Sequence, residues 1–174
     1  MLKQALTLAL AAFATACGAA SQRPALTADS NVCPSGSVRG DAELERYASC
    51  TRVSGDLIVE DVTSLGALSE LRRVDGVLRI QGTDRLYSLE GLDNLENVRE
   101  LSLDKNRALI NAGGLNGVAR VNAVTITGNP RLTKSFGILN GLRERPSRLT
   151  ITANAGLDAE GLRTVATERR IAVR

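Results

Sequence analysis

The sequence predicts a mainly β fold in which short parallel strands stack side by side around a core of aliphatic side chains. Two observations support this prediction. Aromatic residues make up only 2% of a chain that is 43% hydrophobic, so Leu, Val, Ile and Ala must supply the core. An apolar-x-apolar triplet also recurs at intervals of 21 to 25 residues, and such alternation is typical of a strand with one buried side. The triplets begin at Leu57, Leu78, Leu101, Val124, Leu149 and Ile171.

Two further positions repeat in step with the triplets. Five residues after the start of a triplet stand Val62, Thr83, Asn106, Asn129 and Asn154. Three residues later stands a leucine, at positions 65, 86, 109, 132 and 157. An Asn at the end of a strand has a side-chain amide that can pair with backbone groups no longer served by the neighbouring strand. One such turn of chain cannot bury its apolar row alone, so successive turns must stack.

These spacings carry a family resemblance. The pattern Leu-x-Leu-x-x-Asn-x-x-Leu, complete in residues 101–109, resembles the signature of leucine-rich repeats. Residues 86–98 (LYSLEGLDNLENV) are similar to the receptor L domain, the leucine-rich right-handed β-helix of growth-factor-receptor ectodomains, and residues 54–59 fit its opening turn. The resemblance implies a short right-handed leucine-rich β-solenoid with parallel strands and a disulfide-capped N-terminal helix, over residues 33–174. It also implies ligand binding, although family members use paired L domains and this chain has one.

The first 16 residues are predicted to be an export signal. Lys3 precedes an almost wholly apolar stretch, residues 5–14, which is too short to span a bilayer as a helix. The following Ala-Thr-Ala-Cys-Gly resembles the lipobox of bacterial lipoproteins, which implies that Cys17 is lipidated and becomes the new N-terminus. Ordinary secretory cleavage after Ala14 or Ala16 is the alternative. Residues 17–32 then comprise the lipidated Cys and a flexible tether, because this stretch is rich in Ala, Ser, Thr and Asp.

The number of cysteines agrees with a lipid on Cys17. Three cysteines in an exported protein leave one thiol unpaired. If Cys17 carries lipid, Cys33 and Cys50 remain as a pair in an oxidising compartment, where we expect a disulfide. It would close a loop that contains a short helical candidate, residues 41–49, and would stabilise the fold by about 3 kcal/mol.

Export with a lipid on Cys17 predicts a location in the bacterial cell envelope. Gly18, the residue after the lipid site, is not the Asp that commonly retains lipoproteins at the inner membrane. In a cell with two membranes, the outer membrane is therefore favoured.

The residue inventory argues against catalysis. The chain has no His, which removes the commonest general base and metal ligand. It also lacks the HExxH, GxSxG and GxxxxGK[ST] motifs. The carboxylates of Glu60, Asp61, Glu43 and Glu45 are interpreted as solvent-facing. We therefore expect no catalytic residues, no metal and no cofactor.

The predicted strands expose two columns of side chains on either side of the second buried residue of each triplet. In leucine-rich proteins this sheet face is a common docking surface, so a protein or glycan ligand is the natural hypothesis. The simpler interpretation of the threonines is that Thr favours exposed strand positions. The candidate binding residues are Ile58, Arg79, Ser102, Thr125 and Thr150 in one column and Glu60, Gln81, Asp104, Thr127 and Thr152 in the other.

Charge is divided unevenly along the chain. Residues 41–100 contain 13 acidic and 7 basic residues, and residues 101–174 contain 5 acidic and 12 basic residues. The simplest interpretation is a solvated surface, and head-to-tail self-association is a possible consequence. Nucleic acid is disfavoured, because no aromatic residues are interleaved for stacking. The predicted function is a membrane-anchored binding module, and a structural envelope protein without a dedicated ligand is the alternative.

Overall fold

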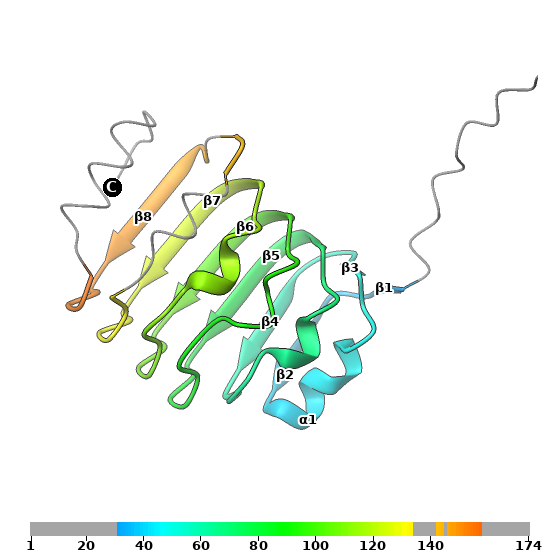
Figure 1. The fold of residues 1–174 in the computed structure, drawn as a ribbon, viewed down its shortest axis with the longest axis horizontal. Helices are drawn as coiled ribbons and strands as arrows, with labels where there is room; N and C mark the ends of the chain where they lie inside the picture. The colour runs from blue at the N-terminus through cyan, green and yellow to red at the C-terminus, as the bar shows by residue number, and fades with distance from the viewer. Residues whose placement is uncertain (1–30, 134–141, 145, 158–174) are drawn as a thin grey trace, which may run out of the picture.

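One parallel sheet dominates the computed structural model, which describes residues 31–133, 142–144 and 146–157 (Figure 1). Its strands are β1 (Val32–Cys33), β2 (Gly36–Arg39), β3 (Arg52–Val53), β4 (Leu57–Glu60), β5 (Arg73–Gln81), β6 (Asn97–Asp104), β7 (Arg120–Thr127) and β8 (Arg148–Thr152). The helical elements of the described residues are α1 (Asp41–Leu44) and three 3-10 turns, η1 (Glu45–Tyr47), η2 (Gly66–Leu68) and η3 (Gly113–Leu115). The chain is therefore mainly β with parallel strands, as the sequence predicts.

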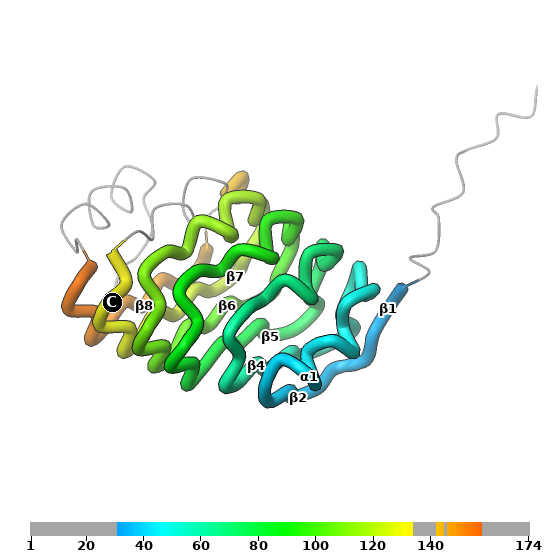
Figure 2. Tube along the Cα trace, turned by 60° about the horizontal axis from the view of Figure 1, so that its bottom comes forward, coloured from blue at the N-terminus to red at the C-terminus, as the bar shows by residue number. Residues whose placement is uncertain are grey.

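The strands neighbour one another in chain order. β5, β6, β7 and β8 follow each other across the sheet, whereas β3 and β4 both pair with β5. β3 and β4 thus lie end to end along the long strand β5, and β1 and β2 pair in turn with β3 and β4. Figure 2 shows the chain winding back after each strand, so that successive turns lie side by side. Within the described residues the sheet is open, because its path ends at β1 and β8.

The predicted register is confirmed for five of the six triplets. Leu57, Leu78, Leu101, Val124 and Leu149 are direct partners across β4 to β8. The sixth triplet, which begins at Ile171, lies outside the described residues. Register is specified strongly here, since a slip of one residue would turn each buried row out to solvent.

Aliphatic side chains form columns that run through the stack of turns. The leucines that follow each strand by a fixed spacing are all buried, as predicted. Two further columns close the other sides of the core without any aromatic residue. The three columns contain Leu65, Leu86, Leu109, Leu132 and Leu157; Leu71, Leu95 and Val118; and Val53, Val74, Val98 and Val121.

A column of buried amides runs beside the leucines. The Oδ1 atom of Asn129 accepts hydrogen bonds from the backbone N (3.0 Å) and Nδ2 (3.1 Å) of Asn106 in the preceding turn. Its Nδ2 atom donates to the carbonyl oxygen of Leu103 (3.0 Å) and to Oδ1 of Asn154 (3.1 Å). Thr83 begins the column by donating its hydroxyl to Asn106 Oδ1 (2.8 Å). The amides therefore satisfy the backbone where each strand ends and also link each turn to the next.

Close packing of the turns explains one of the glycines in the chain. A Cβ atom on Gly114, in η3, would overlap the backbone carbonyl of Leu89 in the preceding turn. Only glycine permits such a close approach of two backbone segments.

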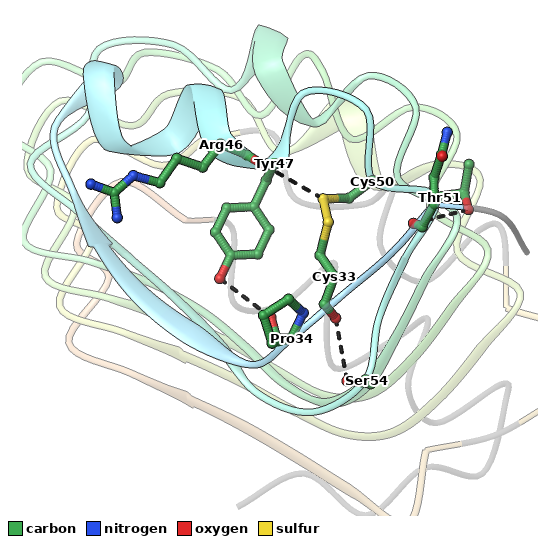
Figure 3. Close-up of a disulfide and its surroundings, with 8 residues drawn as sticks. Cys33, Pro34, Arg46, Tyr47, Cys50, Thr51 and Ser54 are labelled. Carbon is green, nitrogen blue, oxygen red and sulfur yellow. Dashed lines mark hydrogen bonds between the residues drawn. A yellow bond between two sulfur atoms is a disulfide. The ribbon is translucent and has the colours of Figure 1, made fainter.

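The N-terminal turns form a cap that differs in detail from the prediction. The expected disulfide is present between Cys33 and Cys50, with Cα atoms 5.8 Å apart (Figure 3). The helix expected over residues 41–49 is shorter, a single α turn followed by η1. The loop that the disulfide closes also contains the strand β2, which was not predicted. In β2, Gly36 leaves room for the hydroxyl of Tyr47, which donates to the carbonyl oxygen of Pro34 (3.3 Å).

The predicted signal, Cys17 and nearly all of the predicted tether lie in residues 1–30, outside the described residues. The rest of the chain, where the structure describes it, contains no helix that is long and apolar enough to cross a membrane.

We predict that Asn129→Ala lowers the free energy of unfolding by about 2–4 kcal/mol, because it leaves the buried amide N–H of Asn106 without a partner. Urea unfolding followed by circular dichroism measures the change. Asn116→Ala, at an exposed position after η3, is the matched control and should change stability by less than about 0.5 kcal/mol. Equal effects of the two substitutions would contradict a structural role for the amide column.

Candidate functional site

The sheet brings the ten predicted binding residues into two continuous columns, which we call the strand face. Each residue is the direct partner of the corresponding residue on the next strand, and all ten are partly or fully exposed. β2 extends both columns by one residue, because Ser37 pairs with Ile58 and Arg39 with Glu60. Only the tertiary structure reveals this extension, since β2 was not expected.

Charged groups occupy the end of the strand face nearest the N-terminal cap. Arg39 donates a hydrogen bond from Nη2 to Oε2 of Glu60 (2.7 Å), and Gln81 donates from Nε2 to the other carboxylate oxygen (2.5 Å). The hydrogen bond from Arg39, followed by that from Gln81, holds the pKa of the Glu60 carboxyl below its usual range. The same contact raises the pKa of Arg39. Glu60 is therefore a carboxylate held in place from both sides.

A hollow of about 480 Å³ opens where these strands end. Its charged lining residues are four acids, Glu60, Asp61, Asp84 and Asp104, and two bases, Arg39 and Lys105. Nearby cations face two of these acids, with Lys105 Nζ 3.7 Å from Asp104 and Arg107 Nε 3.9 Å from Asp84. These are exposed contacts, which stabilise proteins only weakly and are open to exchange for a partner's groups.

The rim of this hollow is shaped by a turn residue that follows β2, β4, β5, β6, β7 and β8, at the point where each of these strands ends. Each of these residues has a positive φ, the left-handed region that favours glycine. Gly82 adopts it freely, whereas Asp61 (φ 51°) and Lys105 (φ 55°) do so at a cost of about 1–2 kcal/mol each. The full series is Gly40, Asp61, Gly82, Lys105, Gly128 and Ala153.

Sequence reasoning had not singled out this turn position or the hollow. Glycine occupies three of the six turn positions, and this pattern could have revealed them, because a glycine that recurs at one position of a repeat indicates a positive φ.

The opposite end of the strand face is uncharged. Thr125 and Thr127 on β7 are direct partners of Thr150 and Thr152 on β8. The hydroxyls of Thr127 and Thr152 lie 3.1 Å apart, within hydrogen-bond distance. This end offers hydroxyl groups to a ligand and the charged end offers carboxylates, so every residue of the strand face except Ile58 is polar.

The described residues hold no cluster of three or more His, Cys, Asp or Glu side chains arranged to bind a metal ion. Cys33 and Cys50 are joined in the disulfide and carry no free thiol.

Comparison of the chain with protein-family models, with curated proteins and with solved structures finds no match. The likeness to leucine-rich repeats and receptor L domains therefore stands on the repeat positions described above.

Acid should weaken the charged end of the strand face. Because the folded pKa of Glu60 is lowered, its contribution to stability is complete above its unfolded pKa of about 4.3 and is lost as pH falls through the folded pKa. We therefore predict that Glu60→Gln reduces the loss of unfolding free energy between neutral pH and pH of about 3, measured by urea unfolding at each pH.

The matched control for this titration is Glu70→Gln, at an exposed position outside the strand face. It should leave the pH dependence close to that of the parent chain. The effect of Glu60→Gln should itself be small, because the partner Arg39 has a side chain 73% exposed. A steeper loss of stability in acid after Glu60→Gln would show that the charged form is not the stabilised one.

Proposed function

We propose that the chain is a lipid-anchored bacterial envelope or cell-surface protein that binds a protein or glycan partner through the strand face. The proposal assigns it to binding and not to catalysis. The fold that serves this function is a right-handed leucine-rich solenoid of the receptor L type, an assignment that rests on the repeat positions and on the stacked parallel strands.

The observation that carries the proposal is the alignment of exposed polar side chains on five consecutive strands. A parallel sheet places direct partners about 4.8 Å apart, so the two columns form one continuous and mostly polar surface instead of scattered groups. The hollow at its charged end adds a concave element of about 480 Å³ to that surface. Specific recognition commonly combines a small number of fixed polar groups with such a concavity.

The membrane anchor is supported by the lipobox-like residues before Cys17 and by the pairing of the other two cysteines with each other. A structural disulfide between Cys33 and Cys50 also fits an oxidising compartment outside the cytoplasm.

We predict that the chain incorporates a clickable palmitate analogue in its native cells and that Cys17→Ala abolishes the labelling. The variant Cys33→Ala/Cys50→Ala is the matched control, and it should keep the label, because both of those sulfurs are held in the disulfide. Labelling that survives Cys17→Ala, or a chain that stays wholly in the soluble fraction, would overturn the lipid anchor.

Protease treatment of intact and lysed cells then assigns the side of the membrane. Digestion in intact cells would direct the search to partners outside the cell, and protection until lysis would direct it to periplasmic proteins and peptidoglycan.

We predict that Glu60→Lys/Asp104→Lys lowers the capture of envelope proteins or glycans, measured by crosslinking and quantitative mass spectrometry, by at least about tenfold. Reversing charge within an interface typically costs several kcal/mol. Glu70→Lys/Glu90→Lys, at exposed positions outside the strand face, makes the same change in net charge and should leave capture unchanged.

Equal capture by the two double variants would contradict the proposal that the strand face binds the partner. If neither the parent chain nor a variant captures a partner, and deletion weakens the envelope, the structural alternative is favoured instead.

A further inference from the structure

A second exposed surface lies where the long strands begin. The register of β5 against β6 shifts between Val74 and Val77, and such a bulge bends a strand. The first residues of β5 and β6 therefore belong to a different side of the stack from the strand face. Arg52, Arg73 and Arg120 occupy equivalent positions in β3, β5 and β7. We call this surface, with Arg99 and the asparagines at positions 97 and 122, the arginine face.

The arginine face carries more positive than negative charge. Arg52 and Arg73 both donate hydrogen bonds to one carboxylate, that of Asp75, from opposite sides. Beyond this shared aspartate, a hollow of about 350 Å³ is lined by three arginines, Arg73, Arg99 and Arg120, and no other acid. One carboxylate therefore faces three guanidinium groups in the hollow.

The other acidic neighbours hold these arginines weakly. Arg99 Nη2 lies 4.0 Å from the carboxylate of Glu100, at the limit of an ion pair. Arg120 contacts Glu144 at 2.9 Å, but both side chains are 65% exposed, and exposed pairs contribute little. Guanidinium groups held in this way can exchange a surface carboxylate for a phosphate, whose geometry suits bidentate hydrogen bonds.

The position of the arginine face relative to the anchor indicates what it meets. Val32 in β1, almost the first described residue, is the direct partner of Arg52. Figure 1 shows β1 and β3 beside each other at the side where the strands begin. Residues 18–31 lie between this point and Cys17, and the flexible tether predicted from their composition would have an end-to-end distance of about 20 Å. The arginine face therefore lies beside the attachment point, and the strand ends with their acidic hollow lie away from it.

We propose that the arginine face docks on an anionic membrane surface, with the exposed guanidinium groups of Arg73, Arg99 and Arg120 binding lipid phosphates. This inference rests on the lipid anchor of the proposed function, which holds the face near the headgroups. Docking in this orientation turns the charged end of the strand face away from the membrane and toward a partner.

The test uses the full mature chain, reconstituted through its own lipid into vesicles of phosphatidylcholine, with or without anionic phosphatidylglycerol. Phenylglyoxal modifies accessible arginines, and mass spectrometry gives the rate for each residue. We expect Arg73, Arg99 and Arg120 to react at least about threefold more slowly on anionic vesicles than on phosphatidylcholine vesicles, and we expect high salt to remove this difference. Three exposed arginines near the ends of β5 and β6 serve as internal references and should react equally on both kinds of vesicle: Arg79, Arg85 and Arg107.

A pair of matched variants separates a specific face from net charge. Arg52, the direct partner of Arg73, should be protected together with the three proposed arginines, and Arg73→Gln/Arg99→Gln/Arg120→Gln should remove that protection on anionic vesicles. Arg79→Gln/Arg85→Gln/Arg107→Gln lowers the net charge equally and should preserve it.

Equal rates on both kinds of vesicle would overturn the proposal. Protection that rises with the density of protein, and not with lipid charge, would overturn it in favour of contact with a second copy. Flotation with pure phosphatidylcholine vesicles tests the anchor separately. If the chain does not float, the lipid anchor is contradicted. The modification rates of the three arginines can then be measured on the soluble chain with added anionic vesicles, and they still decide whether the arginine face binds phosphate.

Discussion

The hydrogen-bonded column of Thr83, Asn106 and Asn129, which are buried, and Asn154, which is partly buried, is the interaction on which the regular stacking of the turns depends. Each strand ends abruptly, and the backbone groups released there lie in a dry interior where unpaired polar groups are costly. The amides pair with those groups and with one another, so each turn can form only against a neighbour in the same register. The hydrophobic columns stabilise the stack, whereas the amides specify its alignment.

The two candidate surfaces are consequences of that alignment. Because buried residues of successive strands are direct partners, the exposed residues between them must also be partners. The strand face and the arginine face differ because the chain bends within β5, near Val74 and Val77. The bend separates the arginine face, where the strands begin, from the acid-lined hollow, where they end. One stack of turns thus presents two surfaces that differ in charge.

The N-terminal cap follows different rules from the repeats. It is the first turn that the structure describes, and it closes the core with the disulfide and the ring of Tyr47 instead of another row of leucines. β2 could not be predicted, because Gly36 and the nearby Pro34 are typical of a loop and the strand has only one buried residue, Val38. It exists because β4 offers an unpaired edge, which is a property of the assembled sheet.

The sequence by itself determined the parts of this protein that depend on local alternation. The register of the apolar triplets from Leu57 to Leu149, the buried leucines, the Asn positions and the Cys33–Cys50 pair were predictable, because each repeats or pairs within the chain. The strand starts were not, since β5, β6, β7 and β8 each begin before their triplet. Tertiary structure alone decided the features made by groups distant in sequence: the strand β2, the carboxylate of Asp75 shared by Arg52 and Arg73, and the acid-lined hollow beside Glu60. The physical reason is that spacing along a chain records which side a residue faces, whereas contacts between turns depend on how closely and at what angle the turns pack.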